Sequence, residues 1–503
     1  MEIVNSIVSW VIKKRIHQIE LFKSYPHEVQ AEWLTALCYT ARNTEFGKKY
    51  GFGDIRTHDD LINQVPVQDY ESLQEYILRI KHGEQNILWP NKIKWFAKSS
   101  GTTADKSKFI PVSKESLDEC HYKGGKDLLS IYYNQNPESK LFSGKGLVIG
   151  GSSQVNQFSS QSYYGDLSSI IIKNLPYWAE YVRTPSREIA LMPEWESKLE
   201  KMAQAGASEN VTNLSGVPSW NLILLKRILE ISGKDNMLEV WPNFELYAHG
   251  GVSFRPYRKQ YETLFPSDKV TYLETYNASE GFFGIQDQFE NGNNDLLLML
   301  DYGIYYEFLP MSELGKEYPK SLSLAEVEKG VNYALLISTN AGLWRYMIGD
   351  TVEFTSLKPH RIRITGRTKF YINAFGEELI ADNAEEAVKI CHEKTGAIVQ
   401  EYTAGPIFYE NNGGHEWIIE FEKEPEDIEY FIEILDTALK SLNSDYEAKR
   451  YNDMNMRKPK INVVPKGTFY RWMNSRGKLG GQNKVPRLSN ERKFLESILK
   501  IVD

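Results

Sequence analysis

Strand-like segments follow one another between Lys269 and Phe354, and this run constrains the fold more than any other feature of the sequence. The segments KVTYLETYNASEGFFGIQ, NDLLLMLDYGIYYEFLP and VNYALLISTNAGLWRYMIGDTVEF have the β-branched, aromatic and alternating character of strands. Within the third segment, residues 340–342 read Asn-Ala-Gly and predict a hairpin turn. A β-sheet is therefore expected in this part of the chain.

Helical patterns precede this run. Residues 1–90 have the apolar spacing of helices, with a turn-rich interruption around Pro66. GKGLVIGGS, residues 144–152, predicts a short buried strand, and PSWNLILLKRILEISG predicts a helix that has Pro218 in its first turn and Gly233 just past its end. The mixture of long helices and strands indicates an α/β or α+β fold.

The pattern starts again after HRIRITGRTKFYINAFGEEL. A helix is predicted from about Asn383, followed by the strand EWIIEFE, the helix IEYFIEILDTALKSL and the strand KINVVPKG. We therefore predict a large N-terminal domain over residues 1–365, a glycine-bearing hinge over 366–376, and a small mobile α+β domain over 377–503.

Composition excludes some classes of protein. The 503 residues carry a net charge of -8, which argues against a protein that coats nucleic acid, so any anion must be met locally. Cys38, Cys120 and Cys391 are scattered singly, so no disulfide framework or CxxC metal site is expected, and a reducing cytoplasm fits. The opening MEIVNSIVSWVIKKRIHQIELF lacks the order of a secretion signal. It predicts a helix that docks on the protein, with a membrane-surface helix as the alternative.

Several familiar catalytic motifs are absent. The sequence has no GxxxxGK[ST], no GxSxG and no HxxxH pair, so Walker-type nucleotide sites, nucleophile elbows and zinc sites built on such a histidine pair are excluded. Gly144-Lys145-Gly146 with Gly150 has one residue too many for a dinucleotide fingerprint.

One loop has the parts of a phosphate-binding site. In WFAKSSGTTADKSKFIPVS, hydroxyls, a glycine and lysines follow an apolar pair, and they can offer hydrogen bonds and positive charge to a polyphosphate. The residues concerned are Ser99, Ser100, Gly101, Thr102, Thr103, Lys106 and Lys108. A solvated surface turn is the alternative for this loop taken alone.

Two further motifs place glycines and small polar residues just beyond predicted strands, where ligands bind on open α/β sheets. HGGVSF contains Gly250 and Gly251, and ETYNASEGFFG contains Tyr276 and Glu280. Tyr276 could stack on a base, or be a core aromatic. Glu280 could hold Mg2+ among phosphates, or cap a helix.

A charged pair follows later in the chain. Asp350, in WRYMIGDTV, is predicted to follow a strand, where its carboxylate could accept both ribose hydroxyls; a turn residue is the alternative. Arg367, in TGRTKF, could bind the same nucleotide or pair with surface carboxylates.

The ordered motifs SSGTT, HGG, TYNASEG, RYMIGD, TGRTKFYINAFGEEL and GGQNKVPR closely resemble the Gretchen Hagen-type acyl-acid amido synthetases. This family includes auxin-responsive plant enzymes and bacterial relatives, and this chain resembles a bacterial member. The family belongs to the acyl-adenylate-forming superfamily, with acyl-CoA synthetases and luciferases. The match runs from about Trp95 to Arg487, and six motifs in order are far more specific than any one.

The resemblance implies ATP and Mg2+ as cofactors and an ATP site between two domains. It implies that the loop from Ser99 to Lys108 handles the phosphates, that Asp350 holds the ribose, and that Glu280 binds the metal. It further implies that the adenine and ribose pocket is formed by Gly250, Gly251, Tyr276, Asn277, Ala278, Ser279 and Arg367. Lys484 matches the family's catalytic lysine, which acts with Lys108, and Lys478 is the competing candidate.

The sequence departs from the plant pattern in two respects. Asp105 stands where the plant pattern has a glycine, which places a negative charge beside the expected triphosphate site. The acyl pockets of the plant enzymes do not map onto this sequence residue by residue, so auxin or jasmonate is not supported as substrate.

The resemblance therefore implies an ATP-dependent ligase that adenylates a small carboxylic acid and transfers the acyl group to an amine, most simply an amino acid. An acyl-CoA ligase, in which a thiol replaces the amine, is one alternative, and a non-catalytic acyl- or nucleotide-binding protein is another. Neither a nucleic-acid nor a membrane partner is expected, a cytoplasmic location is, and the sequence leaves the oligomeric state open.

Overall fold

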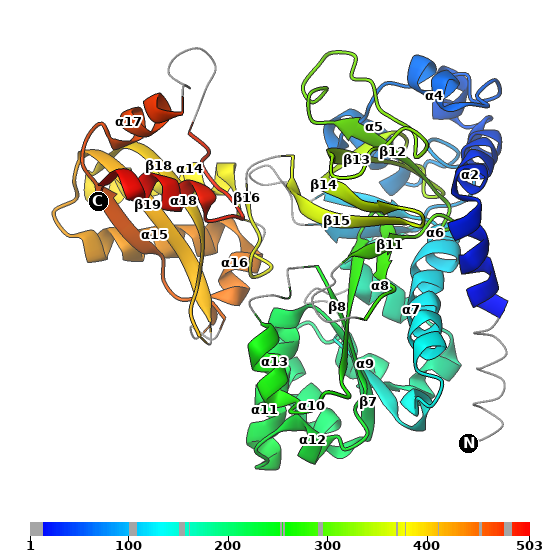
Figure 1. Cartoon of the computed structure of the whole chain (residues 1–503), viewed down its shortest axis with the longest axis horizontal. Helices are drawn as coiled ribbons and strands as arrows, with labels where there is room; N and C mark the ends of the chain where they lie inside the picture. The colour runs from blue at the N-terminus through cyan, green and yellow to red at the C-terminus, as the bar shows by residue number, and fades with distance from the viewer. Residues whose placement is uncertain are drawn as a thin grey trace.

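Figure 1 shows a computed structural model of the chain. The structure describes residues 14–99, 108–149, 156–159, 161–251, 254, 257–289, 295–368, 371–377, 379–410, 412–451, 455–476 and 485–502.

The N-terminal segment is helical, as the sequence predicted. Residues 14–24 form a helix, and α2 (Pro26–Ala41), α3 (Glu45–Lys49), α4 (His58–Gln64) and α5 (Tyr70–Lys81) follow. α4 and α5 each begin with a capping box, which satisfies backbone N–H groups that the first helical turn leaves free. The predicted interruption around Pro66 lies between these two helices. Residues 1–13, which hold most of the predicted docking helix, lie outside the described residues.

Within the described residues, the largest sheet has eleven strands in the order β12-β13-β14-β15-β11-β10-β9-β8-β7-β3-β6. Their bounds along the chain are β3 (Lys145–Val148), β6 (Arg183–Thr184), β7 (Val211–Gly216), β8 (Leu246–Gly250), β9 (Thr271–Ala278), β10 (Gly281–Gln286), β11 (Leu296–Leu298), β12 (Ile304–Pro310), β13 (Asn332–Thr339), β14 (Tyr346–Leu357) and β15 (His360–Arg367). The strands from β9 to β3 and β6 run parallel, whereas those from β9 to β12 are antiparallel.

This sheet is strongly curved. In Figure 1 the antiparallel strands β12 to β15 lie across the direction of the parallel strands β7 and β8. Register shifts between β9 and β10 and between β14 and β15 mark the irregular pairing that lets a sheet bend. The curvature matters because it brings together residues from strands that are not neighbours in the sheet.

A second, smaller sheet has the order β2-β1-β5-β4, with β1 (Trp95–Ser99), β2 (Lys108–Val112), β4 (Asn156–Ser159) and β5 (Ser162–Gly165). β1 and β2 are antiparallel neighbours and flank residues 100–107. The small sheet therefore holds both ends of the predicted phosphate-binding loop.

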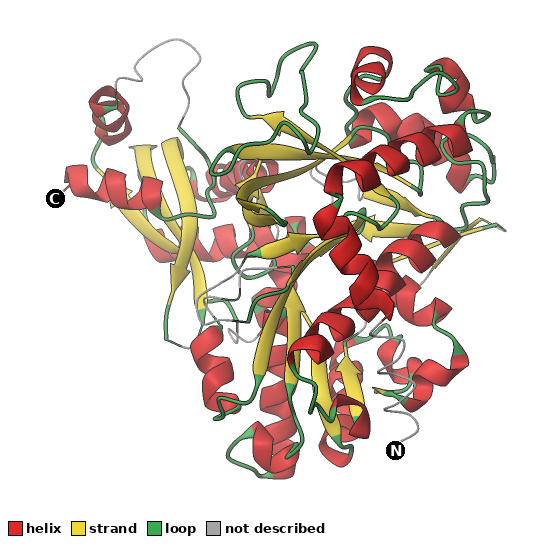
Figure 2. Cartoon of the chain, turned by 45° about the vertical axis from the view of Figure 1, so that its right-hand side comes forward, coloured by secondary structure: helices red, strands yellow, loops and turns green. Residues whose placement is uncertain are grey.

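Helices cover the two sheets (Figure 2). A π-helical segment, Leu117–His121, lies between α6 (Lys114–Ser116) and α7 (Tyr122–Gln135), and buried residues of α10 (Trp195–Ser208) and α11 (Pro218–Ser232) join β7 and β8 in one apolar cluster. α11 begins with Pro218 and ends before Gly233, which has a φ of 65°, as predicted. The remaining helices of this part are 3-10 (Leu141–Ser143), α8 (Leu167–Asn174), 3-10 (Tyr177–Tyr181), α9 (Arg187–Ala190), α12 (Met237–Val240) and α13 (Arg258–Leu264).

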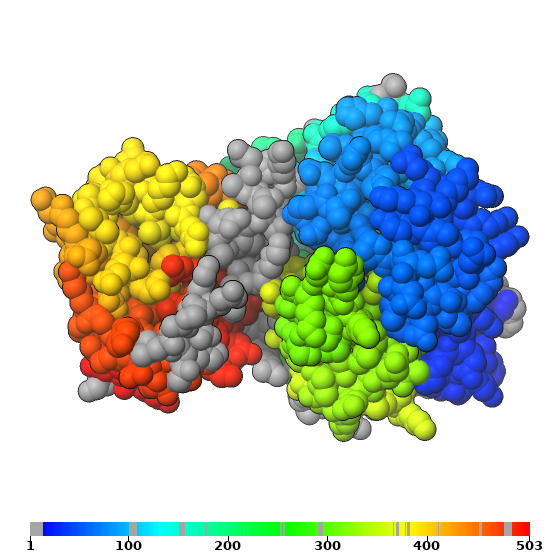
Figure 3. Space-filling view, turned by 90° about the horizontal axis from the view of Figure 1, so that it is seen from above, coloured from blue at the N-terminus to red at the C-terminus, as the bar shows by residue number. Residues whose placement is uncertain are grey.

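The C-terminal part is a three-stranded sheet with helices, in the order β18-β19-β20. Its elements are β16 (Tyr371–Ile372), β17 (Leu379–Ile380), α14 (Ala381–Thr395), β18 (Ile398–Phe408), β19 (Gly413–Lys423), α15 (Ile428–Leu442), α16 (Ser444–Lys449), β20 (Lys460–Val464), α17 (Thr468–Ser475) and α18 (Lys493–Val502). No strand of this sheet pairs with the large sheet within the described residues. Figure 3 shows this part, in yellow to red, at one side of the molecule.

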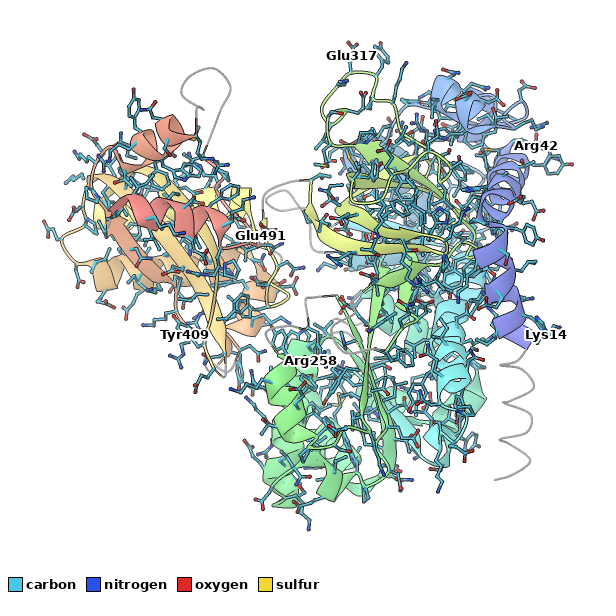
Figure 4. All side chains as sticks on the ribbon, viewed as in Figure 1. Lys14, Arg42, Arg258, Glu317, Tyr409 and Glu491 are labelled. Atoms are coloured by element: carbon cyan, nitrogen blue, oxygen red, sulfur yellow. The ribbon has the colours of Figure 1, made fainter. Side chains whose placement is uncertain are left out.

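Polar contacts join the two parts near α10 and α11. The hydroxyl of Tyr451 donates a hydrogen bond of 2.6 Å to Oε1 of Glu196 in α10, and Nζ of Lys449 lies 3.9 Å from the ring centroid of Trp220 in α11. In Figure 4, Arg258 at the start of α13 lies on the side of the N-terminal part that faces Tyr409 of the C-terminal part. The C-terminal part therefore contacts the N-terminal part at α10 and α11.

The fold class predicted from the sequence is confirmed: the chain combines helices with large and small sheets. The predicted strands, the hairpin between β13 and β14, and the four predicted C-terminal elements are all present. In the part of the chain that the structure describes, no helix has both the length and the apolar character needed to cross a bilayer. The predicted boundaries at 365 and 377 stay predictions.

Candidate active site

The β1–β2 hairpin fixes the ends of the predicted phosphate-binding loop. Ser99, the last residue of β1, pairs with Lys108, the first residue of β2. The residues between them lie outside the described part of the chain and include the predicted phosphate-binding residues Ser100, Gly101, Thr102 and Thr103, as well as Asp105 and Lys106. The structure thus places only the two flanking residues of this loop.

Tyr70, the first residue of α5, holds the start of β2. Its hydroxyl accepts a hydrogen bond of 2.9 Å from the backbone N–H of Phe109, and Nζ of Lys108 lies 5.8 Å from its ring centroid. Tyr70 is 7% exposed, so this contact is sheltered from water. The sequence reading missed Tyr70, and no local pattern could have found it, because it lies thirty-nine positions from its partner.

Three predicted residues meet around one carboxylate. The hydroxyl of Tyr276 donates a hydrogen bond of 2.6 Å to Oδ2 of Asp350, and Nε of Arg367 lies 2.7 Å from Oδ1 of the same carboxylate. Asp350 and Arg367 are opposite each other in the β14–β15 ladder, while Tyr276 comes from β9. Arg367 therefore pairs with a carboxylate of the predicted site and not with one at the surface.

The prediction that Asp350 follows a strand is wrong. Asp350 lies inside β14, which continues to Leu357, because Gly349 adopts a φ of 98° and the pairing shifts register just after it. A glycine at positive φ lets the backbone bend without ending the ladder. Likewise, Tyr276, Asn277 and Ala278 belong to β9 itself, and only Ser279 and Glu280 form the turn to β10.

Glu280 lies in this turn, within reach of the same charges. Burial raises the pKa of its carboxyl, whereas the positive charges of Lys108 and Arg367 act in the opposite direction and Asp350 adds to the rise. The side chain caps no helix, because it stands between two strands. A half-buried carboxylate that feels the charges of Lys108 and Arg367 is suited to a metal ion bound together with phosphates.

The ring of Tyr276 is in the core. Tyr276 is 5% exposed, and its ring centroid lies 4.8 Å from that of Phe283. Burial, together with Asp350, raises the pKa of its hydroxyl well above the usual value, so the phenol stays protonated and donates. This geometry favours a core aromatic over a ring that stacks on a base, and it leaves the hydroxyl to orient Asp350.

Gly250 and Gly251 close β8 next to this cluster. A Cβ at Gly250 would lie 2.5 Å from the carbonyl oxygen of Thr275, and Gly251 has a φ of 82°. Glycine at 250 is therefore required for the close approach of β8 to β9. A contact of these glycines with adenine stays a prediction.

Lys484 and Lys478 cannot be placed, because residues 477–484 lie outside the described residues. The structure thus brings together Lys108, Tyr276, Glu280, Asp350 and Arg367 from four strands and one turn. These residues combine acceptors suited to hydroxyl groups, cations suited to phosphates and one carboxylate suited to Mg2+.

The donor set fits ATP and Mg2+. Among the described residues, no group of three or more His, Cys, Asp or Glu side chains is placed to hold a metal ion by itself. Mg2+ instead commonly takes one or two carboxylates together with the phosphates of a nucleotide, and the half-buried Glu280 supplies such a carboxylate. The protein part of the site is thus compatible with a nucleotide-bound Mg2+.

Comparison with protein families identifies the chain. Residues 15–270 match the GH3 family N-terminal domain, 297–367 the GH3 family central domain and 382–493 the GH3 family C-terminal domain. The chain belongs to the GH3 family. Within this GH3 protein, Lys108 and Gly250 fall in the N-terminal domain match, Asp350 and Arg367 in the central domain match and Lys484 in the C-terminal domain match. The family predicted from the sequence motifs is confirmed.

Known GH3 proteins match the chain over nearly its whole length. It is 25% identical to the Arabidopsis thaliana indole-3-acetic acid-amido synthetase GH3.3, with 91% of this chain and 89% of that protein covered. A solved structure of the AtGH3.15 acyl acid amido synthetase in complex with 2,4-DB has a TM-score of 0.65 at 18% identity, covering 98% of this chain and 96% of that chain.

The fold also extends beyond the amido synthetases. A 2-hydroxyisobutyryl-CoA ligase in complex with 2-HIB-AMP and CoA has a TM-score of 0.55 at 12% identity, covering 95% of this chain and 92% of that chain. The likeness to these solved structures concerns the fold. The relatives named by sequence are plant proteins, and a bacterial origin for this chain stays a prediction.

Proposed function

We propose that this GH3 chain adenylates a small carboxylic acid with ATP and then joins the acyl group to an amine, most simply an amino acid. The chain is an ATP-dependent ligase of the acyl acid amido synthetase type. The observation that carries the proposal is the cluster of Lys108, Tyr276, Glu280, Asp350 and Arg367, formed from distant motifs in a chain whose relatives are amido synthetases.

In the first step, the carboxylate oxygen of the acid attacks the α-phosphate of ATP, and the bond to pyrophosphate breaks. Two anions must approach each other, so the site has to neutralise charge at phosphorus and on the leaving group. In our proposal this charge is neutralised by Lys108, at the start of β2, and by the backbone N–H groups of the loop from Ser99. When bound, Mg2+ would supply further charge neutralisation on the phosphates, and Glu280 would hold it.

The nucleoside is held on the other side of the cluster. Asp350 accepts hydrogen bonds from the ribose hydroxyls, Tyr276 and Arg367 fix the orientation of its carboxylate, and Gly250 and Gly251 border the adenine together with Asn277, Ala278 and Ser279. A carboxylate oxygen has more than one acceptor direction, so Asp350 can keep its two present donors and still accept from a sugar.

In the second step, the amine attacks the carbonyl of the acyl-adenylate, and AMP leaves. No enzyme nucleophile is required, because the mixed anhydride is already activated. We propose that Lys484 reaches the reacting groups from the C-terminal part, and that the segment 366–376 is the hinge between a domain of residues 1–365 and one of 377–503. Exclusion of water would protect the acyl-adenylate from hydrolysis.

We further propose a cytoplasmic location and no nucleic-acid or membrane partner. All three cysteines are free and buried, which is compatible with a reducing compartment.

The acceptor is tested by product analysis. The protein is incubated with ATP, Mg2+ and a panel of aryl, indolyl and fatty acids, together with either pooled amino acids or coenzyme A, and products are identified by mass spectrometry. An amide of one acid with an amino acid is expected. A thioester alone would make the protein an acyl-CoA ligase, and ATP binding with no product from any acid would make it a binding protein.

A further inference from the structure

The hydroxyl of Tyr346 is buried without a partner. Tyr346 is the first residue of β14 and is 0% exposed, and its hydroxyl makes no hydrogen bond within the described residues. Leaving a buried polar group unpaired costs roughly 1–3 kcal/mol, so native proteins usually provide a partner. An unpaired hydroxyl next to a candidate site therefore suggests that the partner is a ligand.

The surroundings place this hydroxyl at the phosphate end of the site. The charged groups that act on it are Glu280, Glu71 and Asp69, and the Tyr70 hydroxyl is also close. Gln68 fixes the backbone on both sides, because its N–H donates to the carbonyl of Arg345 and its carbonyl accepts from Met347, each at 2.9 Å. Tyr346 thus pairs with Gln68, which precedes α5, and it feels the charge of Glu280; the first residue of α5, Tyr70, holds Phe109 beside Lys108.

The spacing along β14 agrees with this placement. Tyr346 precedes Asp350 by four residues on the same strand, which corresponds to about 13 Å of extended chain. A nucleotide whose ribose is held at Asp350 can place its terminal phosphates at such a distance. Residues at even spacing on a strand share a face, although the bend at Gly349 modifies this locally.

The hydroxyl keeps its proton at neutral pH and can therefore donate. Burial raises the pKa of Tyr346 well above its usual value, so the proton stays on the phenol. A donor needs an acceptor, and the ionised phosphate oxygens of ATP only accept. The nearby Tyr70 hydroxyl accepts a hydrogen bond from the backbone N–H of Phe109, and within the described residues it accepts none from Tyr346.

We propose that the Tyr346 hydroxyl donates a hydrogen bond to an oxygen of the β- or γ-phosphate of ATP. This inference rests on the proposed function, because it takes Mg-ATP as the substrate. As the bond to the α-phosphate breaks, negative charge grows on the departing pyrophosphate, and a hydrogen bond to it becomes stronger. Tyr346 would therefore bind ATP and also assist departure of pyrophosphate.

The variant Tyr346→Phe tests this directly, since it removes the hydroxyl and keeps the ring. Calorimetry measures the affinity of the parent and the variant for Mg-ATP, pyrophosphate and AMP. We expect Mg-ATP and pyrophosphate to bind about tenfold more weakly and AMP to bind as in the parent, because only the first two carry the phosphates concerned. The melting temperature of the free variant should be unchanged or higher, since an unpaired buried hydroxyl is removed.

Tyr402→Phe is the matched control. Tyr402 is also buried, its hydroxyl is also unpaired among the described residues, and it lies on β18 in the C-terminal part. This control should bind all three ligands as the parent does. Equal losses of ATP and AMP affinity in Tyr346→Phe, or no loss at all, would overturn the inference. If the parent itself binds neither ATP nor AMP, the proposed function fails with it.

Discussion

The hydroxyl of Tyr276 donates a hydrogen bond of 2.6 Å to Oδ2 of Asp350, although β15, β11 and β10 lie between their strands in the sheet. Only a curved sheet can bring β9 and β14 this close. The hydrogen bond fixes the carboxylate from one side, and Arg367 fixes it from the other at 2.7 Å. The carboxylate that we assign to the ribose is therefore oriented before a nucleotide binds.

The pairing of Tyr276 with Asp350 predicts non-additive effects on nucleotide binding. Asp350→Asn should weaken AMP binding about tenfold, because a charged acceptor is lost. Tyr276→Phe should weaken it less, and the double variant should lose less than the sum, with a coupling energy of roughly 1 kcal/mol for residues in direct contact. The affinities of the parent, the two single variants and the double variant for AMP are measured by calorimetry, and they give the coupling energy.

Asp295→Asn is the matched control for this cycle. Asp295 pairs at 3.2 Å with Arg363 of β15, the strand that carries Arg367, but Arg363 is half exposed. This substitution should leave AMP affinity unchanged. Strict additivity of the two site substitutions would contradict an orienting role for Tyr276.

Kinetic measurements should show which of the two candidate lysines, Lys484 or Lys478, is catalytic. Lys484→Ala should lower acid-dependent pyrophosphate release by about a hundredfold, because a cation that meets the transition state is removed, while ATP affinity stays unchanged. Lys478→Ala should leave both quantities near the parent's values. Stopped-flow release of pyrophosphate and calorimetry with ATP provide the two readouts. A loss of ATP affinity equal to the loss of rate would contradict the role of Lys484.

The contacts between the N-terminal and C-terminal parts predict that substitutions which remove them will let the two parts move apart. Trp220→Leu combined with Tyr451→Phe removes a cation–π contact of 3.9 Å and a hydrogen bond of 2.6 Å. We expect a larger radius of gyration in small-angle X-ray scattering, because these contacts hold the C-terminal part on α10 and α11, and an unchanged affinity for AMP.

Tyr430→Phe is the control for this prediction. Tyr430 lies on α15 and is 46% exposed, close to the 41% of Tyr451. It should leave the scattering profile as it is. An identical profile for the double variant would mean that other contacts set the arrangement.

Lys81 predicts a specific dependence of stability on pH. Lys81 is 3% exposed, and its Nζ lies 3.4 Å from the ring centroid of Phe109 and 3.9 Å from that of Phe158. Burial lowers the pKa of this lysine from 10.5 to about 8. The unfolded chain keeps the proton up to pH 10.5 and the folded protein releases it near 8, so in this window the unfolded state binds more protons and stability rises with pH.

Lys81→Met removes the titrating group, so the pH dependence caused by Lys81 should appear as a difference in melting temperature between the parent and the variant. The melting temperature of the parent relative to that of the variant should rise between pH 7.5 and pH 10, because the cost of a buried charge disappears from the parent in that window. Lys126→Met, at an exposed position of α7, should show no such change. A difference that is the same at both pH values would contradict burial of a charged Lys81.

Local signals explain what could be predicted from the sequence. Pro218 and Gly233 delimit α11 because proline suits a first helical turn and glycine suits the left-handed conformation after the last one. The strands β12 to β14 were recognisable because their β-branched and aromatic residues suit a buried sheet. These signals act within a few residues and need no tertiary context.

The elements and contacts that could not be predicted from the sequence depend on tertiary contacts. The strand β18 contains Gly405 and Pro406, which disfavour strands, yet it forms because it pairs with β19 from Ile398 to Phe408. The predicted site residues could be proposed from their motifs, but the contact of Tyr276 with Asp350 depends on the curvature of the sheet. Tyr346 lies inside the RYMIGD motif but was given no role there, and Tyr70 lies in no motif, so only the surroundings of their hydroxyls mark them.

The most direct test of the central claim is pyrophosphate release from ATP and Mg2+ by the whole protein, measured across aryl, indolyl and fatty acids, with and without amino acids. The account predicts release that depends on one class of acid, accelerates with an amino acid, and falls in the Asp350→Asn variant. Pyrophosphate release that is the same with and without every acid, or none with any of them, would contradict the assignment of this site to carboxylate adenylation.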